Sequence, residues 1–283
     1  MLPPIASSFV AGETPEAALA HVETLNRRGV AGILNLLGEH YDERAPADAD
    51  ADAYVDLVEA IADRGVDACV SVKPSQIGLD VGDDVFQENL ARVVEAADAS
   101  GETFVWIDME DHETTDVTLD AFERHALATD GNVGVCTQAN LKRTREDLER
   151  LADLPGKVRL VKGAYDESAA IAHTEKSRVD ESYRDCLAYM FEAFDDGVAV
   201  GSHDPAMIEH AAELHAEHGT PYEVQMLTGV REAAQFELAS DPGVDAEVYQ
   251  YIPYGSKWFS YFYRRIRERK SNALFALRAI VGN

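Results

Sequence analysis

Short apolar runs alternate with longer amphipathic stretches along this chain, and the alternation constrains the fold more than any other feature. Runs rich in Val and Ile have the length and spacing of β-strands. The intervening stretches have helical periodicity, as in Asp52–Arg64 and Ser182–Phe194. The eight predicted strands are Gly32–Leu37, Ala68–Lys73, Thr103–Asp108, Val133–Gln138, Val158–Gly163, Val198–His203, Tyr222–Leu227 and Tyr249–Ile252.

Nearly continuous apolar strands joined through helices predict a parallel sheet covered on both faces. Eight such units in 283 residues favour a closed (β/α)8 barrel over an open sheet. The first strand is followed by Leu36-Leu37-Gly38-Glu39-His40, which lacks the G-x-G-x-x-G expected of an open dinucleotide-binding sheet. We predict one domain over residues 1–283, with a loop above the barrel at Glu39–Ala51.

Helix ends are also marked in the sequence. Asp204-Pro205, after Ser202-His203, is typical of a helix start, and Arg64-Gly65 is typical of a helix end.

Charge and composition exclude several classes of protein. The formal net charge is −27, from 52 acidic and 25 basic residues, so nucleic acid and anionic membranes would be repelled. No apolar run approaches the roughly 18 residues of a membrane span, and the N-terminus lacks a basic region followed by an apolar one. We therefore expect a cytoplasmic protein. The acidic excess, concentrated in stretches such as Asp48–Asp52, suggests adaptation to high salt, as in halophilic cells.

The three cysteines, Cys69, Cys136 and Cys186, form no Cys-x-x-Cys pair. A disulfide framework or zinc ribbon is therefore not predicted. Cys69 and Cys136 lie inside apolar strands and are expected to be small core residues.

Polar residues gather at the carboxyl ends of the predicted strands, where barrel enzymes carry their chemistry. A later helix contains the adjacent pair Arg264–Arg265, which with Lys73 suits a carboxylate. Each residue alone also has a structural explanation, such as capping or a solvated helix face. The donors suited to phosphates or a heteroaromatic ring are Gln138, Arg159, Lys162 and His203.

Three other readings of these residues compete. Lys162 could form a Schiff base in an aldolase, although that leaves the Arg pair unexplained. Asp108, Glu110 and His203 could hold a metal, but they lack a compact multi-histidine signature and have cationic neighbours. A non-catalytic acidic binding protein would match the surface charge, but it would not need polar strand ends.

The chain resembles the flavin-dependent proline dehydrogenases over nearly its whole length. The most specific pieces are Arg159-Leu160-Val161-Lys162-Gly163-Ala164-Tyr165 and Tyr261-x-x-Arg264-Arg265-x-x-Glu268. The resemblance implies a distorted barrel with an extra N-terminal helix and a C-terminal helix covering the active site. It implies noncovalent FAD, with FMN less expected. The implied reaction oxidises L-proline to Δ1-pyrroline-5-carboxylate by hydride transfer to flavin N5, with a quinone as acceptor and peripheral membrane contact as an open alternative.

The resemblance also implies residue roles. Asp108 and Arg159 are the implied catalytic residues. The cofactor would be bound by Met109, Gln138, Arg159, Lys162, Gly163, Ala164, Ser202 and His203. The substrate would be bound by Lys73, Tyr165, Leu227, Tyr251, Tyr261, Arg264, Arg265 and Glu268. Two positions depart from the family pattern: Asp166 stands where larger members often have Trp, and Asp204 where several have Asn.

Overall fold

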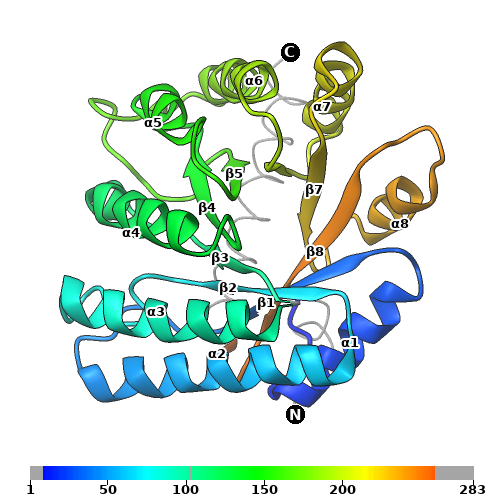
Figure 1. Ribbon diagram of the computed structural model, residues 1–283. Coiled ribbons are helices and arrows are strands. Elements are labelled where there is room, and N and C mark those ends of the chain that lie inside the picture. Colours follow the sequence, from blue (N-terminus) through cyan, green and yellow to red (C-terminus); the bar gives the residue numbers. More distant parts are fainter. Residues whose placement is uncertain (1–8, 102, 259–283) are drawn as a thin grey trace, which may run out of the picture.

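The structure, a computed structural model, describes residues 9–101 and 103–258. Eight parallel strands pair in sequence order and close into a barrel, with helices packed around the outside (Figure 1). This confirms the predicted (β/α)8 fold. The strands are β1 (Ala31–Leu36), β2 (Ala68–Val72), β3 (Val105–Ile107), β4 (Val133–Gln138), β5 (Lys157–Val161), β6 (Val198–Gly201), β7 (Tyr222–Leu227) and β8 (Glu247–Tyr254). The helices are α1 (Pro15–Asn26), α2 (Arg44–Arg64), α3 (Asp83–Ser100), α4 (Thr115–Ala128), α5 (Thr144–Leu151), α6 (Lys176–Ala193), α7 (Pro205–His218) and α8 (Glu232–Ser240), with a 3-10 turn η2 (His112–Thr114).

The main apolar core lies between the strands and the helices. Successive strand residues point to opposite faces, so one set in each strand faces outward. These outward residues are almost all apolar and buried, as Val70, Leu160 and Val224 illustrate. The inner face is different, because it carries a small apolar cluster around Trp106 together with polar side chains such as Arg159. The barrel interior is therefore where buried chemistry is concentrated.

Helix α1 packs outside β1 and β8, which confirms the extra N-terminal helix. A Cβ on Gly32 of β1 would meet Val22 of α1 at 2.8 Å, so the close approach requires glycine there. The predicted C-terminal helix lies outside the described residues. The expected helix signals are confirmed: Asp204 caps α7 ahead of Pro205, and Gly65 ends α2 in the left-handed conformation.

The prediction of a loop over Glu39–Ala51 was wrong for its second half, because α2 already begins at Arg44. Alanine is the strongest helix former, and both Ala47 and Ala51 are buried against the core. The acidic residues between them are also engaged. Asp48 accepts a hydrogen bond from Asn89, and Asp50 accepts one from Tyr41. The stretch from Arg44 to Ala51 thus forms the amphipathic first two turns of a helix.

Candidate active site

An ion pair between the buried Arg159 guanidinium and the partly buried Asp108 carboxylate lies in the barrel's polar interior. Asp108, just after β3, accepts hydrogen bonds from Ser71 of β2 at 2.8 Å and from the Nη2 of Arg159 on β5. The Tyr251 hydroxyl on β8 donates to the second Asp108 oxygen at 2.6 Å. The three donors come from three strands, so barrel closure alone brings them together. The sequence predicted both Asp108 and Arg159 here, and the structure places them in contact.

Tyr251 is held as a hydrogen-bond donor. Burial first, and the Asp108 carboxylate second, raise the pKa of Tyr251 well above its ordinary value. The Arg159 guanidinium also lies over an aromatic surface, with its Cζ 4.8 Å from the centre of the Trp106 ring. A planar cation on an aromatic face, paired with a carboxylate in a dry interior, has a well-defined orientation.

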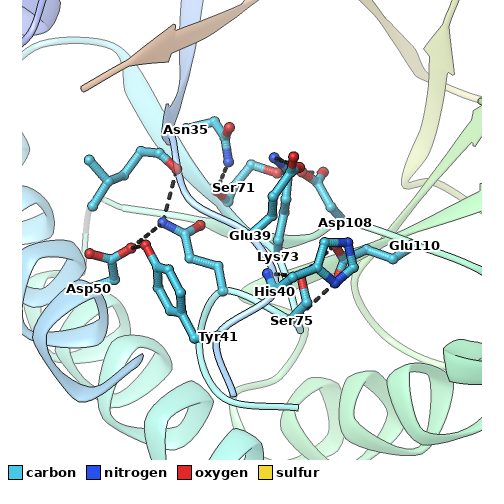
Figure 2. Close-up of polar contacts among 12 residues, drawn as sticks. Asn35, Glu39, His40, Tyr41, Asp50, Ser71, Lys73, Ser75, Asp108 and Glu110 are labelled. Carbon is cyan, nitrogen blue, oxygen red and sulfur yellow. Dashed lines mark hydrogen bonds and ion pairs between the residues drawn. The ribbon is translucent and has the colours of Figure 1, made fainter. Parts of the chain in front are cut away.

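Lys73 follows β2, and its amine lies 3.5 Å from the Glu39 carboxylate in the segment after β1 (Figure 2). The sequence predicted Lys73 as a carboxylate-binding residue but did not single out Glu39. The Lys73 side chain is 13% exposed and that of Glu39 is 27% exposed, so the pair is reachable from solvent. An incoming anion would meet a cation that already has a carboxylate partner.

The turn that carries Lys73 is fixed by a second carboxylate. Glu110, after β3, accepts hydrogen bonds from the Ser75 backbone N–H and the Ser75 hydroxyl, both at 2.7 Å (Figure 2). Burial raises the pKa of Glu110, and the bonds from Ser75 oppose this shift. Gln138, the last residue of β4, donates to the Glu110 backbone carbonyl at 2.7 Å. Gln138 is thereby oriented at the same end of the barrel as Asp108.

Lys162, directly after β5, is bound by two carboxylates. It donates to Asp204 at 2.8 Å and to Asp180 of α6. Asp204 also caps α7 by accepting from the Ala206 N–H at 3.2 Å, and the bond from Lys162 holds the pKa of Asp204 below its ordinary value. Asp204 therefore has two structural roles that an asparagine could fill only in part. A Schiff-base lysine acts as a free amine in an apolar pocket, which does not describe Lys162.

Gly163 has a φ of +103°, and a Cβ there would meet the Asn140 side-chain oxygen at 2.0 Å. Only glycine suits both the conformation and the contact. Among the described residues, none donates a hydrogen bond to the Asn140 side-chain oxygen, which is buried. Ala164 is exposed and Tyr165 is half-buried, so the backbone after β5 reaches the surface here.

The remaining predicted cofactor residues have visible structural roles. The Ser202 hydroxyl accepts from the Asp204 N–H at 3.1 Å. His203 Nε2 accepts from the Leu227 backbone N–H at 3.3 Å, and Arg231 donates to the His203 carbonyl. Met109 is buried in the main core.

Four predicted substrate residues, Tyr261, Arg264, Arg265 and Glu268, lie outside the described residues.

In the described part of the chain, no residues are arranged to bind a metal ion or to act through a reactive thiol. Within residues 9–101 and 103–258, no group of three or more His, Cys, Asp or Glu residues is arranged to hold a metal ion. All three cysteines are buried, which confirms the prediction for Cys69 and Cys136. Burial raises the pKa of Cys186 to about 11, so its thiol stays protonated at neutral pH.

The comparison with protein families decides the assignment. The proline dehydrogenase family model matches residues 18–278. The chain belongs to the proline dehydrogenase family. Proline dehydrogenase 1 of Bacillus subtilis subsp. natto is 37% identical over 98% of this chain and 90% of its own length. The proline dehydrogenase of Deinococcus radiodurans is also 37% identical, with the same coverage.

A solved structure agrees with the fold. Proline utilization A from Bdellovibrio bacteriovorus, inactivated by N-propargylglycine, superposes with a TM-score of 0.83 at 23% identity. The match covers 92% of this chain and 32% of that one.

Family membership makes the chain an oxidoreductase of a flavin-dependent family, and it removes the aldolase alternative. Among the described helices, none is long and apolar enough to cross a bilayer.

The sequence analysis gave no functional role to Glu39, Glu223 or Gln225. Glu39 fell in a segment interpreted as a loop. The sequence does carry a pattern that marks Glu223 and Gln225, because β7 alternates polar and apolar residues as Tyr-Glu-Val-Gln-Met-Leu. In a strand with a buried outer face, such alternation indicates a polar inner face.

Proposed function

We propose that this chain is an FAD-dependent enzyme that oxidises L-proline to Δ1-pyrroline-5-carboxylate and passes the electrons to a quinone. The observation that carries the proposal is the buried Arg159 guanidinium, held between Asp108, Gln225 and the Trp106 ring. A fixed cation in a dry site favours negative charge on a neighbouring group, which is how a protein tunes a flavin. The bound flavin would supply the hydride acceptor.

The residues present suit such a cofactor. Gln138 and Arg159 are oriented by bonds to neighbouring groups and offer polar contacts for a heteroaromatic ring. Lys162 supplies a cation for phosphates, and Gly163 beside it adds no side chain at this strand end. Asp180 and Asp204 already neutralise part of that charge, so phosphate binding there would compete with two carboxylates.

The substrate would bind on the side of the polar interior nearest Lys73. Proline has one carboxylate and an otherwise apolar ring, so it needs a cationic grip and apolar or aromatic walls. We propose that Lys73, Arg264 and Arg265 bind the carboxylate, that Glu268 orients the Arg pair, and that Tyr165, Leu227, Tyr251 and Tyr261 surround the ring. The enzyme's own contribution is then chiefly positioning of the reacting carbon.

The test is spectroscopic. Purified protein should be yellow, and anaerobic L-proline should bleach the flavin absorbance while D-proline serves as the control. Released cofactor that migrates as FAD, and turnover with a soluble quinone, would support the finer assignments. Colourless protein that takes up no added FAD and reduces no dye with proline would refute the proposal.

A further inference from the structure

Hydrogen bonds continue from Arg159 away from Asp108, along the barrel interior. Arg159 Nη1 donates to the Gln225 side-chain oxygen at 3.0 Å. The Gln225 amide donates to one Glu223 oxygen at 2.5 Å, and the other Glu223 oxygen accepts from Lys157 at 2.5 Å. Lys157, Glu223, Gln225, Arg159 and Asp108 form what we call the interior chain. Its charges alternate in sign from Lys157 to Asp108.

Small residues on β6 leave room for the side chains of the interior chain. Strand β6 lies between β5, which carries Arg159, and β7, which carries Gln225. In the paired register, β6 places Ala199 beside Arg159 and Gly201 beside Gln225. A Cβ on Gly201 would lie 3.3 Å from the Arg159 Cγ and 2.6 Å from a Val161 methyl carbon. A larger β6 side chain would therefore crowd the space in which the side chains of β5 and β7 meet.

The two charges at the far end of the interior chain differ in burial. The Glu223 side chain is 4% exposed, whereas that of Lys157 is 33% exposed. Both line a cavity of about 890 Å³ at the amino ends of the strands, where Glu247 is exposed beside them. Water screens the Lys157 charge much more than the Glu223 charge. The field of Glu223 therefore acts mainly on the buried part of the interior chain, which includes Arg159.

We propose that Glu223 and Gln225 are positioning residues for the oxidation, which hold the Arg159 guanidinium against Asp108 and balance its charge from the opposite side. The Arg159 guanidinium then binds the Asp108 carboxylate directly on one side. On the other side, the Gln225 amide connects it to the Glu223 carboxylate. The effective positive charge offered to a neighbouring group is set by both carboxylates. This inference rests on the proposed function, in which the flavin lies beside Arg159.

A purely structural role for these residues makes a different prediction. If Glu223 and Gln225 only fill the barrel interior, their variants change stability, and any effect on the flavin has the same sign for both. A charge-balancing role predicts opposite signs. Glu223→Gln removes a negative charge, and Gln225→Glu adds one beside the guanidinium. Positive charge near the flavin favours its anionic reduced form.

The experiment measures the flavin midpoint potential of the holoenzyme by dye equilibration. Glu223→Gln should shift the potential to more positive values and Gln225→Glu to more negative values. Glu247→Gln is the matched control, because it removes the same charge from an exposed residue lining the same cavity, and its potential should equal that of wild type. Wild-type potentials in both interior variants, or shifts of the same sign in both, would overturn the proposal.

A flavin-free measurement separates this inference from the proposed function. If the full chain takes up no flavin, the proposed function fails, but the positioning of Arg159 can still be measured by NMR exchange of its side-chain N–H protons. Gln225→Met should accelerate that exchange, and Glu247→Gln should not. Exchange as slow in Gln225→Met as in wild type would refute the positioning role independently of any cofactor.

Discussion

The Asp108 carboxylate is bound to the Arg159 guanidinium inside the barrel, although the two residues are 51 positions apart in the chain. Barrel closure produces this pair: Asp108 follows β3, and Arg159 lies on β5 with β4 between them. Taking two charges out of water is costly, and the cost is repaid only while both partners are present. The pair is therefore the most sensitive point in the described site.

Asp108→Asn should be severely damaging. The substitution removes the charge that compensates Arg159 and turns one acceptor oxygen into a donor that faces donors. Breaking a buried pair costs about 3–5 kcal/mol, so the free energy of unfolding in urea should fall by that order. We also expect kcat/KM for proline to fall by about 100-fold or more.

Asp111→Asn is the control for Asp108→Asn. Asp111 begins the nearby 3-10 turn by accepting from the Thr114 N–H, and asparagine can keep that bond. Both the urea midpoint and kcat/KM should stay near wild type. Equal losses in the two variants would contradict a special role for Asp108.

Glu39→Gln should tighten proline binding. Glu39 lies 3.5 Å from the Lys73 amine, where a substrate carboxylate would compete with it. A partly exposed pair of this kind contributes up to about 1 kcal/mol, so KM should fall by about two- to fivefold with kcat changing little. Steady-state kinetics would measure this, with Asp42→Asn, an exposed charge in the same segment, as the control. A KM that rises would mean that Glu39 helps bind substrate.

The architecture was predictable from the sequence, but the pairing inside the barrel was only partly so. Apolar runs such as Val133–Gln138 and helix signals such as Arg64-Gly65 are local, and local patterns determine where elements begin and end. The pair Glu39–Lys73 depends on how one loop turns toward the next strand, which no local pattern encodes. The interior chain is an intermediate case: the alternation in β7 marks Glu223 and Gln225 as inward-facing, but their partners follow from strand order and from the small residues of β6.

Arg265→Met should raise the KM for proline while leaving the flavin bound. Arg265 lies outside the described residues, and its role in binding the proline carboxylate is the one proposed above from the family resemblance. Losing one partner of a desolvated charge pair costs about 2 kcal/mol or more, which corresponds to a rise in KM of roughly 30-fold or more. Flavin content per protein should be unchanged, and Arg267→Met tests whether any nearby arginine has the same effect. An unchanged KM would remove Arg265 from the substrate site.

His125→Leu should make folding less sensitive to acid. His125 is buried in α4, its Nε2 has no hydrogen-bond partner within residues 9–101 and 103–258, and burial lowers its pKa from the ordinary 6.5. Below that ordinary value the unfolded chain binds a proton that the folded chain resists, so stability is lost as pH falls toward the folded pKa. The loss is up to about 1.4 kcal/mol per pH unit in that window.

Urea titrations at about pH 7.5 and 5.5 would measure this effect of His125. Wild type should lose more stability than His125→Leu between these conditions, while an exposed-site control, His218→Leu, should behave as wild type. Equal acid sensitivity in all three proteins would show that the His125 environment is not what penalises the charged form.

Potassium chloride should stabilise the protein, although many visible ion pairs would be weakened by it. Arginines link neighbouring helices, as Arg92 does with Asp52 between α3 and α2, and Arg150 with Glu123 between α5 and α4. Such exposed pairs contribute about 0–1 kcal/mol each, and salt reduces that. The formal net charge of −27, however, leaves 27 more acidic than basic residues, and their mutual repulsion is screened over a Debye length of about 3 Å at 1 M salt. We expect the screening of repulsion to dominate. Tm should then rise by roughly 2–4 °C for each kcal/mol by which screening increases the free energy of unfolding.

Melting in dilute buffer and at about 1 M KCl would measure this rise in Tm, and NaCl at equal ionic strength should act alike. A Tm that stays constant or falls would show that the helix-linking pairs outweigh the repulsion, and that the acidic surface is not an adaptation to salt.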